Sequence, residues 1–286
     1  MRARTAPVRP RRTPSGFTRT RLRSVVDAVV GSVLTARTLA ARRCGADLGA
    51  PSRVSRAAPG EHGDVDDDAG RSADEGFAAR LRRETAEAHG AAERSPFMEE
   101  LLSGSLGPAA LTTFLAQVHH LYAVLEPAVD AARDDVVVAP FADDRLRRLP
   151  AVSADLRAHA GEGWREHLVP LPAAERYAER LRQVATWPAG LVTHHYLRYL
   201  GDLSGGQVVR RLLARAYGWP EAELRSWDFP GVPSPKRYRD HYRSLLDAAP
   251  WDEAERGRVV EEARRGYRLN EELFDDLSAR LPEWRR

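Results

Sequence analysis

Apolar residues recur at helical spacing along the chain from Phe77 onward. The clearest stretch lies between residues 108 and 132, where large apolar side chains fall every three or four positions. This spacing predicts an amphipathic helix, and Pro108 suits its first turn because proline is tolerated there. No run of alternating apolar and polar residues bounded by turn signals occurs, so we predict an all-α fold.

Further helices are predicted over residues 77–93, 98–102, 146–158, 173–184, 190–217, 236–248 and 251–281. Clusters of proline and glycine separate them, as at Trp187-Pro188 and across residues 229–233. The first of these segments has no proline, and no glycine before Gly90, so it is expected to form one helix. Without an internal repeat, the pattern predicts a single domain over residues 77–284, larger than a simple four-helix bundle.

Residues 1–76 differ in composition from the rest. Arginine, proline, serine, threonine and alanine dominate up to residue 58, and an acidic run from Asp64 to Asp68 follows. Few large apolar residues are present, so this segment is predicted to be a disordered extension. Two alternatives stay open: a targeting leader, because Arg11-Arg12 precedes a mildly apolar stretch, and a basic arm for nucleic acid or membrane.

The charge of the chain is concentrated in this extension. The protein has 286 residues and a formal net charge of +3, with 44 basic and 41 acidic residues. Residues 1–76 hold 14 of the arginines and nine acidic residues, which leaves 30 basic and 32 acidic residues beyond them. The domain is therefore nearly neutral, and a nucleic-acid partner is not expected. Lys236 is the only lysine.

The cysteine content and the hydropathy of the chain exclude several classes of protein. One cysteine, Cys44, rules out a disulfide framework or a zinc cluster, and no C-x-x-C-H motif for covalent haem attachment occurs. A reducing cytoplasm fits this content. No apolar run approaches the roughly 20 residues that a membrane-spanning helix needs.

The segment from Tyr196 to Gln207 is the most unusual in the chain. Gly201, Gly205 and Gly206 fall within a predicted helix, where each costs about 1 kcal/mol relative to alanine. Such a cost is expected where the backbone approaches a flat ligand or bends. Because Asp202 lies among these glycines, the pattern indicates a large planar ligand against bare backbone with a carboxylate nearby.

His89 is the histidine whose neighbours indicate chemistry. Small residues flank it, and Arg82 lies seven residues earlier on the same face of the expected helix. One imidazole with a cation about 10 Å away suits a haem iron and a propionate, although a lone helical histidine is more often an ordinary core or surface residue. The other helical histidines are expected to be core or surface residues, and His159 and His167 to lie on the surface. No spacing predicts a multi-ligand metal site.

Residues 236–243 carry two arginines on one helix face, Arg239 and Arg243. A solvated face is the simplest interpretation. The two guanidinium groups also suit paired carboxylates of a ligand, and a nucleic-acid patch is disfavoured by the neutral domain.

The chain resembles haem oxygenase of the biliverdin-producing kind. Three segments carry the resemblance, and they occur in the same order: the His89 segment, the string Y-x-R-Y-L-G-D-L-S-G-G-Q, and the Y-x-x-x-Y-R segment. The resemblance covers about residues 77–281. Other matching stretches are Ala88–Glu93, Phe97-Met98, Tyr122 to Glu126, Asp228-Phe229-Pro230, and Leu269-Asn270 through Phe274. It implies an all-α fold in which haem b lies between a proximal helix and a kinked, glycine-rich distal helix.

The resemblance also implies roles for individual residues. His89 would be the proximal iron ligand and Glu93 its neighbour that fixes the ring. Gly201, Gly205 and Gly206 would form the distal helix, where Asp202, helped by Arg198 and Tyr122, anchors the waters that carry protons. The expected propionate-contacting residues are Tyr196, Arg82, Arg239 and Arg243. Arg82 and Arg239 stand where many relatives have lysine, which leaves the haem orientation open.

The implied activity is the conversion of haem and O2 into biliverdin, Fe²⁺ and CO. Electrons must come from outside, because no flavin, nicotinamide or iron–sulfur motif is present, and a ferredoxin or a cytochrome-reductase-type flavoprotein is the expected donor. Two alternatives are a haem-sequestering or transfer protein without turnover, and a helical enzyme without haem, such as a thiamin-degrading protein. The second would need a nucleophilic cysteine or paired carboxylates in the core, and Cys44 lies outside the domain.

Overall fold

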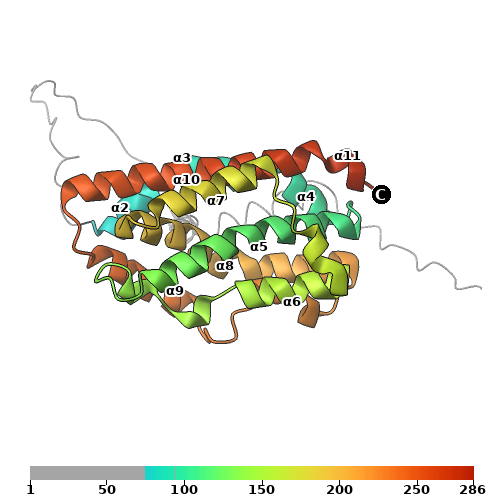
Figure 1. Ribbon diagram of the computed structural model, residues 1–286, viewed down its shortest axis with the longest axis horizontal. Helices are drawn as coiled ribbons and strands as arrows, with labels where there is room; N and C mark the ends of the chain where they lie inside the picture. Colours follow the sequence, from blue (N-terminus) through green and yellow to red (C-terminus); the bar gives the residue numbers. More distant parts are fainter. Residues whose placement is uncertain (1–74, 94) are drawn as a thin grey trace, which may run out of the picture.

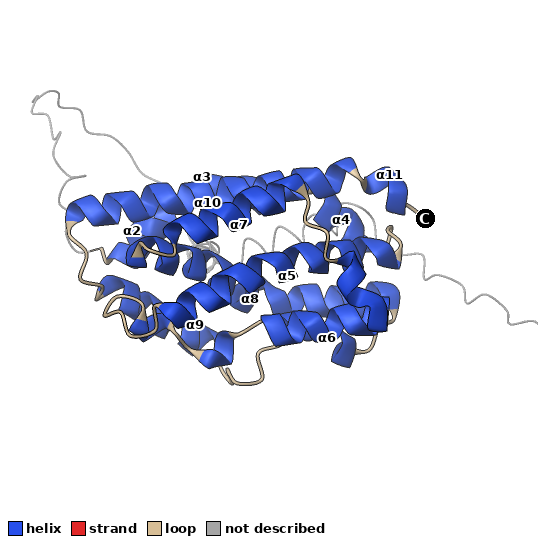
Figure 2. Ribbon diagram, in the orientation of Figure 1, coloured by secondary structure: helices blue, strands red, loops and turns tan. Residues whose placement is uncertain are grey.

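The computed structural model of the protein describes residues 75–93 and 95–286, apart from the side chain of Glu93. The described residues form α-helices and short 3-10 helices, with an isolated bridge between Leu106 and Arg285 and no strand (Figure 2). This confirms the all-α prediction. The elements are α2 (Phe77–Glu84), α3 (Ala86–Glu93), α4 (Pro96–Ser103), α5 (Pro108–Ala131), η1 (Ala139–Phe141), η2 (Asp144–Leu146), α6 (Leu149–Ala160), η3 (Glu162–His167), α7 (Pro172–Val184), α8 (Pro188–Tyr217), η4 (Glu221–Glu223), η5 (Arg225–Trp227), α9 (Pro235–Asp247), α10 (Glu253–Ala279) and α11 (Leu281–Trp284).

Three long helices organise the domain. α10 packs against α3 on one side and against α7 and α8 on others, while α5 packs against α6 and α7 (Figure 1). A continuous cluster of buried apolar side chains runs through the contacts among α5, α6, α7, α8 and α10, but it includes no residue of α3. The extension and Cys44 lie outside the described residues, so the domain boundary at residue 77 stays a prediction. No helix in the described part of the chain is long and apolar enough to cross a membrane.

The helix ends follow the proline and glycine signals in the sequence. Proline occupies the first turn of α5, α7, α8 and α9, where its missing N–H costs no hydrogen bond. Gly104 and Gly218 end α4 and α8 in the left-handed conformation, with φ of 79° and 71°. The helices predicted after residue 95 are therefore present, with ends that differ by a few residues.

The first predicted helix is wrong in one respect, because it is broken at Thr85. α2 ends at Glu84 and α3 begins at Ala86, and Thr85 between them has φ −108° and ψ 4°. The Thr85 hydroxyl donates to the Leu81 carbonyl oxygen (2.7 Å), a local bond that competes with helical geometry. Arg82 and His89 thus stand on two successive helices, although the backbone bonds from the Thr85 N–H to Leu81 (3.1 Å) and from the His89 N–H to Thr85 (2.9 Å) continue the helical pattern across the break. Their placement on one face stays a prediction.

A buried ionic cluster joins α7, α8 and α10. Glu262 of α10 accepts two hydrogen bonds from Arg180 (2.8 and 2.6 Å), and His194 of α8 contacts it through Nε2 at 2.8 Å. His194 is fully buried and Glu262 is 5% exposed. Burial disfavours the charged carboxylate, but the bonds from Arg180 and His194 outweigh it and lower the pKa of Glu262 to about 2. Burial also lowers the pKa of His194.

Glu262→Ala is expected to lower the free energy of unfolding by about 3 kcal/mol, because it leaves a buried imidazole and a partly buried guanidinium without their acceptor. Urea unfolding followed by circular dichroism measures this loss. Glu272→Ala is the matched control: Glu272 bonds Arg176 between the same two helices, but both side chains are about half exposed. This variant should lose less than about 1 kcal/mol.

The same cluster predicts how stability depends on pH. The unfolded chain takes up a proton on His194 below pH 6.5 and on Glu262 below pH 4.5, whereas the folded chain resists both. The free energy of unfolding should therefore decrease as pH falls below 6.5, and more steeply from 4.5 toward 2. In Glu262→Ala the free energy of unfolding should fall less steeply between pH 4.5 and pH 2 than in the unmodified protein, because Glu262 no longer contributes to this fall. An unchanged slope below pH 4.5 would contradict the assignment.

Candidate active site

The three glycines of α8 are not equivalent. At Gly201 and Gly205 an added Cβ would meet no atom within 4 Å, whereas at Gly206 it would lie 3.2 Å from Cδ1 of Trp227. Gly201 and Gly205 are four residues apart and so share one helix face. Gly206 instead allows η5 to pack closely against α8. α8 is helical throughout this stretch, and a kink there stays a prediction.

Asp202 lies beside this bare face and is bonded to α5. The hydroxyl of Tyr122, which is fully buried, donates to Asp202 Oδ2. Burial raises the pKa of Asp202, and this effect exceeds the opposing influence of Arg198 and of the Tyr122 hydroxyl. Burial and the adjacent Asp202 carboxylate raise the pKa of Tyr122 well above its usual value. The Asp202 carboxylate therefore accepts a proton more readily than it would in water, and the neighbouring Tyr122 hydroxyl keeps its proton.

Arg198 completes this cluster from one turn earlier on α8. Its guanidinium lies 5.3 Å from the centre of the Tyr122 ring, and its Nη1 donates to Asn270 Oδ1 of α10 (3.3 Å). Burial disfavours its charge, but Tyr122 and Asp202 together raise the pKa of Arg198. Its Nε is buried without a hydrogen-bond partner. A buried donor of this kind is costly unless a ligand or water accepts from it.

His89 is held by α10 as well. It lies half-buried on α3, and its ring contacts the ring of Tyr267 edge-on at a centroid distance of 5.3 Å. On the preceding segment, Arg264 Nε of α10 donates to the Glu84 carbonyl oxygen (3.1 Å), which ties the end of α2 to the same helix. The proximal segment is therefore positioned by α10 rather than by α8.

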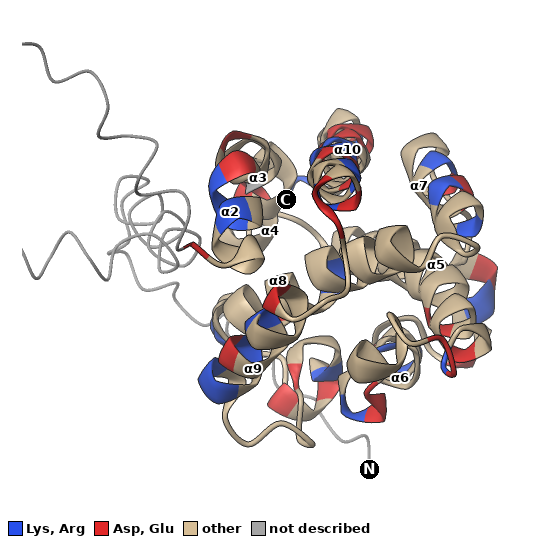
Figure 3. Ribbon diagram, turned by 90° about the vertical axis from the view of Figure 1, so that its left-hand side faces the viewer, with Lys and Arg blue, Asp and Glu red and all other residues tan. Residues whose placement is uncertain are grey.

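One turn of α10 connects the two groups. Tyr267, which contacts His89, and Asn270, which accepts from Arg198, are three residues apart and neighbours on the helix surface. Viewed along the long axis, α2 and α3 lie above α8 and α9, beside α10 (Figure 3). The sequence thus brings one imidazole and one bare helix face, far apart in the chain, to the same turn of a third helix.

The expected cationic residues gather around Tyr196. Burial raises the pKa of Tyr196, and the positive charges of Arg243 and Arg82 oppose this rise. Both guanidinium groups are therefore close enough to Tyr196 to influence it electrostatically. Burial, and then the charge of Arg243, lower the pKa of Arg239, whose Nε is buried without a partner. These residues come from α2, α8 and α9. Together they form a cationic rim suited to carboxylates of a ligand.

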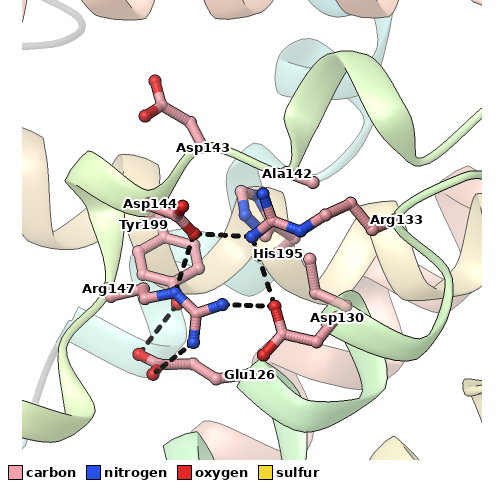
Figure 4. A pocket seen from close by; sticks show the side chains of 10 residues that line it. Glu126, Asp130, Arg133, Ala142, Asp143, Asp144, Arg147, His195 and Tyr199 are labelled. Atoms are coloured by element: carbon pink, nitrogen blue, oxygen red, sulfur yellow. Dashed lines mark hydrogen bonds and ion pairs between the residues drawn. The ribbon is translucent and has the colours of Figure 1, made fainter.

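Behind α8, on the side of α5, is a small polar pocket of about 20 Å³, enough for one water (Figure 4). Its floor is the buried Glu126, whose Oε1 accepts from the backbone N–H groups of Arg148 (2.6 Å) and Leu149 (3.0 Å) and from the Tyr199 hydroxyl (3.2 Å). Glu126 follows Tyr122 by one turn of α5. It anchors the chain after η2 and holds Tyr199 of α8 in place.

The remaining histidines form no metal site, since no group of three or more possible metal ligands occurs among the described residues. His159 differs from expectation: it is half-buried, its Nε2 lies 2.8 Å from the Glu223 carbonyl oxygen, and its ring packs on Trp219. This contact fixes η4 against α6. The side chain of Glu93 lies outside the described part of the chain, so its role stays a prediction.

Sequence reasoning assigned no role to three residues of this site. Asn270 lies in a stretch that carried the resemblance, but its bond to Arg198 joins residues 72 positions apart. Tyr267 and Trp227 gave no signal, because a single aromatic residue at helical spacing is usually part of the core. In the structure one contacts His89 and the other packs against Gly206.

The arrangement defines a class of all-α protein in which one imidazole and one glycine-lined helix face are attached to the same turn of a third helix. Comparison with known proteins gives the family. The family model described as Heme oxygenase matches residues 75–276. Heme oxygenase 2 of Synechocystis is 34% identical over 70% of this chain and 82% of its own length, and human heme oxygenase 1 is 35% identical over 70% and 71%.

Solved structures agree. Heme oxygenase-2 of Synechocystis, crystallised with heme and NO, matches with a TM-score of 0.67 and 33% identity over 71% of this chain and 85% of its own. Heme oxygenase of Leptospira interrogans matches with a TM-score of 0.66 and 30% identity over 70% and 98%. The chain therefore belongs to the haem oxygenase family, which confirms the resemblance found in the sequence.

Proposed function

We propose that the protein is a haem oxygenase that uses O2 and externally supplied electrons to cleave haem b to biliverdin, Fe²⁺ and CO. The observation that carries this proposal is the Asp202–Tyr122 pair beside the bare face of Gly201 and Gly205. A protein that only sequesters haem needs no buried carboxylate at such a face. Membership of the family supports the same activity.

The residues present fit a haem group. Gly201 and Gly205 leave room for a flat ring, because no atom lies where their side chains would stand. The buried Nε atoms of Arg198 and Arg239 lack acceptors, and the rim formed by Tyr196, Arg82 and Arg243 is cationic. A ring with two propionates would supply the flat surface and the carboxylates that these groups require.

Each group then has a distinct task. His89 would hold the iron through one ring nitrogen, and the contact with Tyr267 would orient the ring. Gly201 and Gly205 would cover the other face with backbone and so limit the ligands that fit there. The propionates would bind Tyr196, Arg82, Arg239 and Arg243. When bound, haem supplies the iron that activates O2 and the porphyrin edge that is oxidised.

Protons would pass through the Asp202 cluster. The raised pKa of the Asp202 carboxylate lets it take up a proton nearer to neutral pH, and the Tyr122 hydroxyl fixes its orientation. Arg198, held by Asn270, keeps a positive charge beside it. Waters bridging this carboxylate and the covered face would carry protons without placing an acidic side chain directly on the reacting oxygen.

The direct test is turnover. The purified full chain is mixed with haem and a chemical or enzymatic reductant in air, and the biliverdin absorption band and CO are followed. Formation of both supports the proposal. A stable haem complex that yields neither would instead identify a haem-sequestering protein. The kind of electron donor and the cytoplasmic location stay predictions.

Gly201→Ala is expected to stabilise the protein without haem and to weaken haem binding. Alanine in a helix is favoured over glycine by about 1 kcal/mol, and nothing opposes the new methyl group. The same methyl would collide with a ring lying on the helix. Thermal unfolding and a haem titration measure the two effects.

Gly257→Ala is the matched control, because Gly257 also meets no atom within 4 Å but precedes Tyr267 by ten residues, or about 15 Å, along α10. It should stabilise the protein by a similar amount and leave haem affinity unchanged. Equal haem affinities of the two variants would contradict the placement of haem against Gly201.

A further inference from the structure

A groove of about 710 Å³ runs between the end of α7 and the first half of α10. It lies outside the proposed haem site. Two surfaces line it: one from α7 and the turn after it, the other from the face of α10 that does not contact α3. Its lining includes Arg180, Trp187, Arg258, Glu262, Arg265 and Arg268.

The groove has an excess of unpaired positive charge. Glu262 at its floor is already neutralised by Arg180, and Arg258 pairs with Glu255 (2.6 Å) and stacks on Trp187. Arg265 and Arg268 are exposed, one turn apart, and make no ion pair with any described residue. Most arginines of this surface do have an acidic partner, as Arg176 does in Glu272. The groove therefore favours a ligand with several carboxylates.

The described chain begins beside this end of α10. The N–H of Ala78 donates to Asp247 Oδ1 (2.7 Å), Arg80 forms an ion pair with Glu253, and the guanidinium of Arg256 lies 5.7 Å from the centre of the Phe77 ring. The N-terminal extension thus joins the domain at the first turn of α10. The groove starts within one turn of the same point, at Gly257 and Arg258.

The part of the extension next to this junction is strongly acidic. Residues 61–74 contain six acidic side chains and one arginine, and four of the six lie between Asp64 and Asp68. The next residue, Glu75, already pairs with Arg83 of α2. The arginine-rich part of the extension comes earlier in the chain. The segment closest to the groove therefore has the charge opposite to that of the groove.

The length of the connection matches the distance to be covered. Asp68 and Asp64 precede Gly76 by eight and twelve residues, which reach at most about 26–40 Å at roughly 3.3 Å per residue. From Phe77 near Arg256, Arg265 is about 14 Å along α10 and about half a turn around a helix roughly 10–12 Å wide, so the path is about 30 Å. The acidic run can reach Arg265 and Arg268 of its own chain.

We propose that the acidic segment, residues 61–74, binds the α7–α10 groove of the same chain through Arg265 and Arg268. The tether keeps the segment at an effective concentration near the millimolar range, so a few weak ion pairs suffice. A second copy of the chain or a separate acidic protein would satisfy the same charges, but neither gains from the tether. The contact is independent of haem and of turnover.

Zero-length carbodiimide cross-linking tests this contact in the full chain. The reagent joins carboxylates to amines, and Lys236 is the only native lysine, so background is low. R268K places an amine in the groove and keeps the charge. R211K is the matched control, since Arg211 is an exposed helical arginine of α8 without an ion pair to a described residue. Circular dichroism checks that both variants fold.

We expect mass spectrometry to find R268K joined to carboxylates of residues 61–74, at a yield several-fold above R211K. Adding R265E to R268K, or raising the salt to about 1 M, where the Debye length is about 3 Å, should bring the yield down to the control. An equal mixture of light and ¹⁵N-labelled chains should give only isotopically matched pairs. Mixed pairs, equal yields at the two positions, or no cross-link in R268K would overturn the proposal.

Discussion

Replacing His89 by alanine is expected to abolish the iron coordination of the haem complex. The described part of the chain offers no cluster of other metal ligands, and His89 is the imidazole that α10 positions beside the bare face of α8. Even residues that only orient a metal ligand change metal affinity by about 10–100-fold, so loss of the ligand itself should cost at least about 100-fold. Titration of the apoprotein with haem, followed by its absorption spectrum, measures this effect.

His119→Ala provides the control for this experiment. His119 is also half-buried on a long helix and contacts an aromatic ring edge-on, that of Trp164. Its removal should leave the bound-iron spectrum unchanged. Added imidazole should restore much of the spectrum of the His89 variant, because the space left by the ring admits a free ligand. A spectrum that is the same before and after His89→Ala would refute the assignment.

Asp202→Asn is expected to separate binding from turnover. Asparagine keeps the shape of the side chain but cannot take up a proton, so biliverdin formation should fall by about 10²–10⁴-fold, the range that general acid–base groups contribute. Haem affinity should change little, because Asp202 contacts Tyr122 rather than the expected propionate residues. Single-turnover formation of biliverdin, measured beside a haem titration, distinguishes the two effects.

Two further variants sharpen this result. Asp276→Asn alters a partly buried aspartate that accepts from the backbone N–H of Ala173, and it should leave turnover unchanged. Tyr122→Phe removes the hydrogen bond that lowers the pKa of Asp202. The pKa of the carboxylate should then rise, and the acid limb of the turnover profile should move to higher pH. Normal biliverdin output from Asp202→Asn would show that protons arrive by another route.

The sequence predicted the helices well because their ends have local causes. Pro108 begins a helix since proline lacks only an N–H that has no partner there, and Gly104 ends one since it adopts a positive φ. The break at Thr85 has a different origin. No glycine or proline marks it, and threonine occurs in many unbroken helices, so the bond from its hydroxyl to Leu81 could not be foreseen.

The sequence predicted individual residues of the candidate site but not how they are arranged around one another. The glycines around Asp202 indicated a bare helix face, but the sequence could not show that Gly206 packs against Trp227 while Gly201 and Gly205 do not. That difference depends on a turn 20 residues later. In the same way, the cluster of Arg180, His194 and Glu262 joins three helices, and each member taken alone looks like an ordinary surface or core residue.

The attachment of both His89 and Arg198 to one turn of α10 restricts how a bulky product can leave. The α3 segment with His89 and the α8 segment with Arg198 form the two walls of the site. If α10 shifted as a rigid body, both walls would move with it, and the distance between them would stay the same. Increasing that distance requires a change within a wall. Thr85, where α2 gives way to α3, and the glycines of α8 are the compliant points. Departure of the product should therefore be sensitive to stiffening at residue 85 or 205 and indifferent to stiffening of the outer surface of α10.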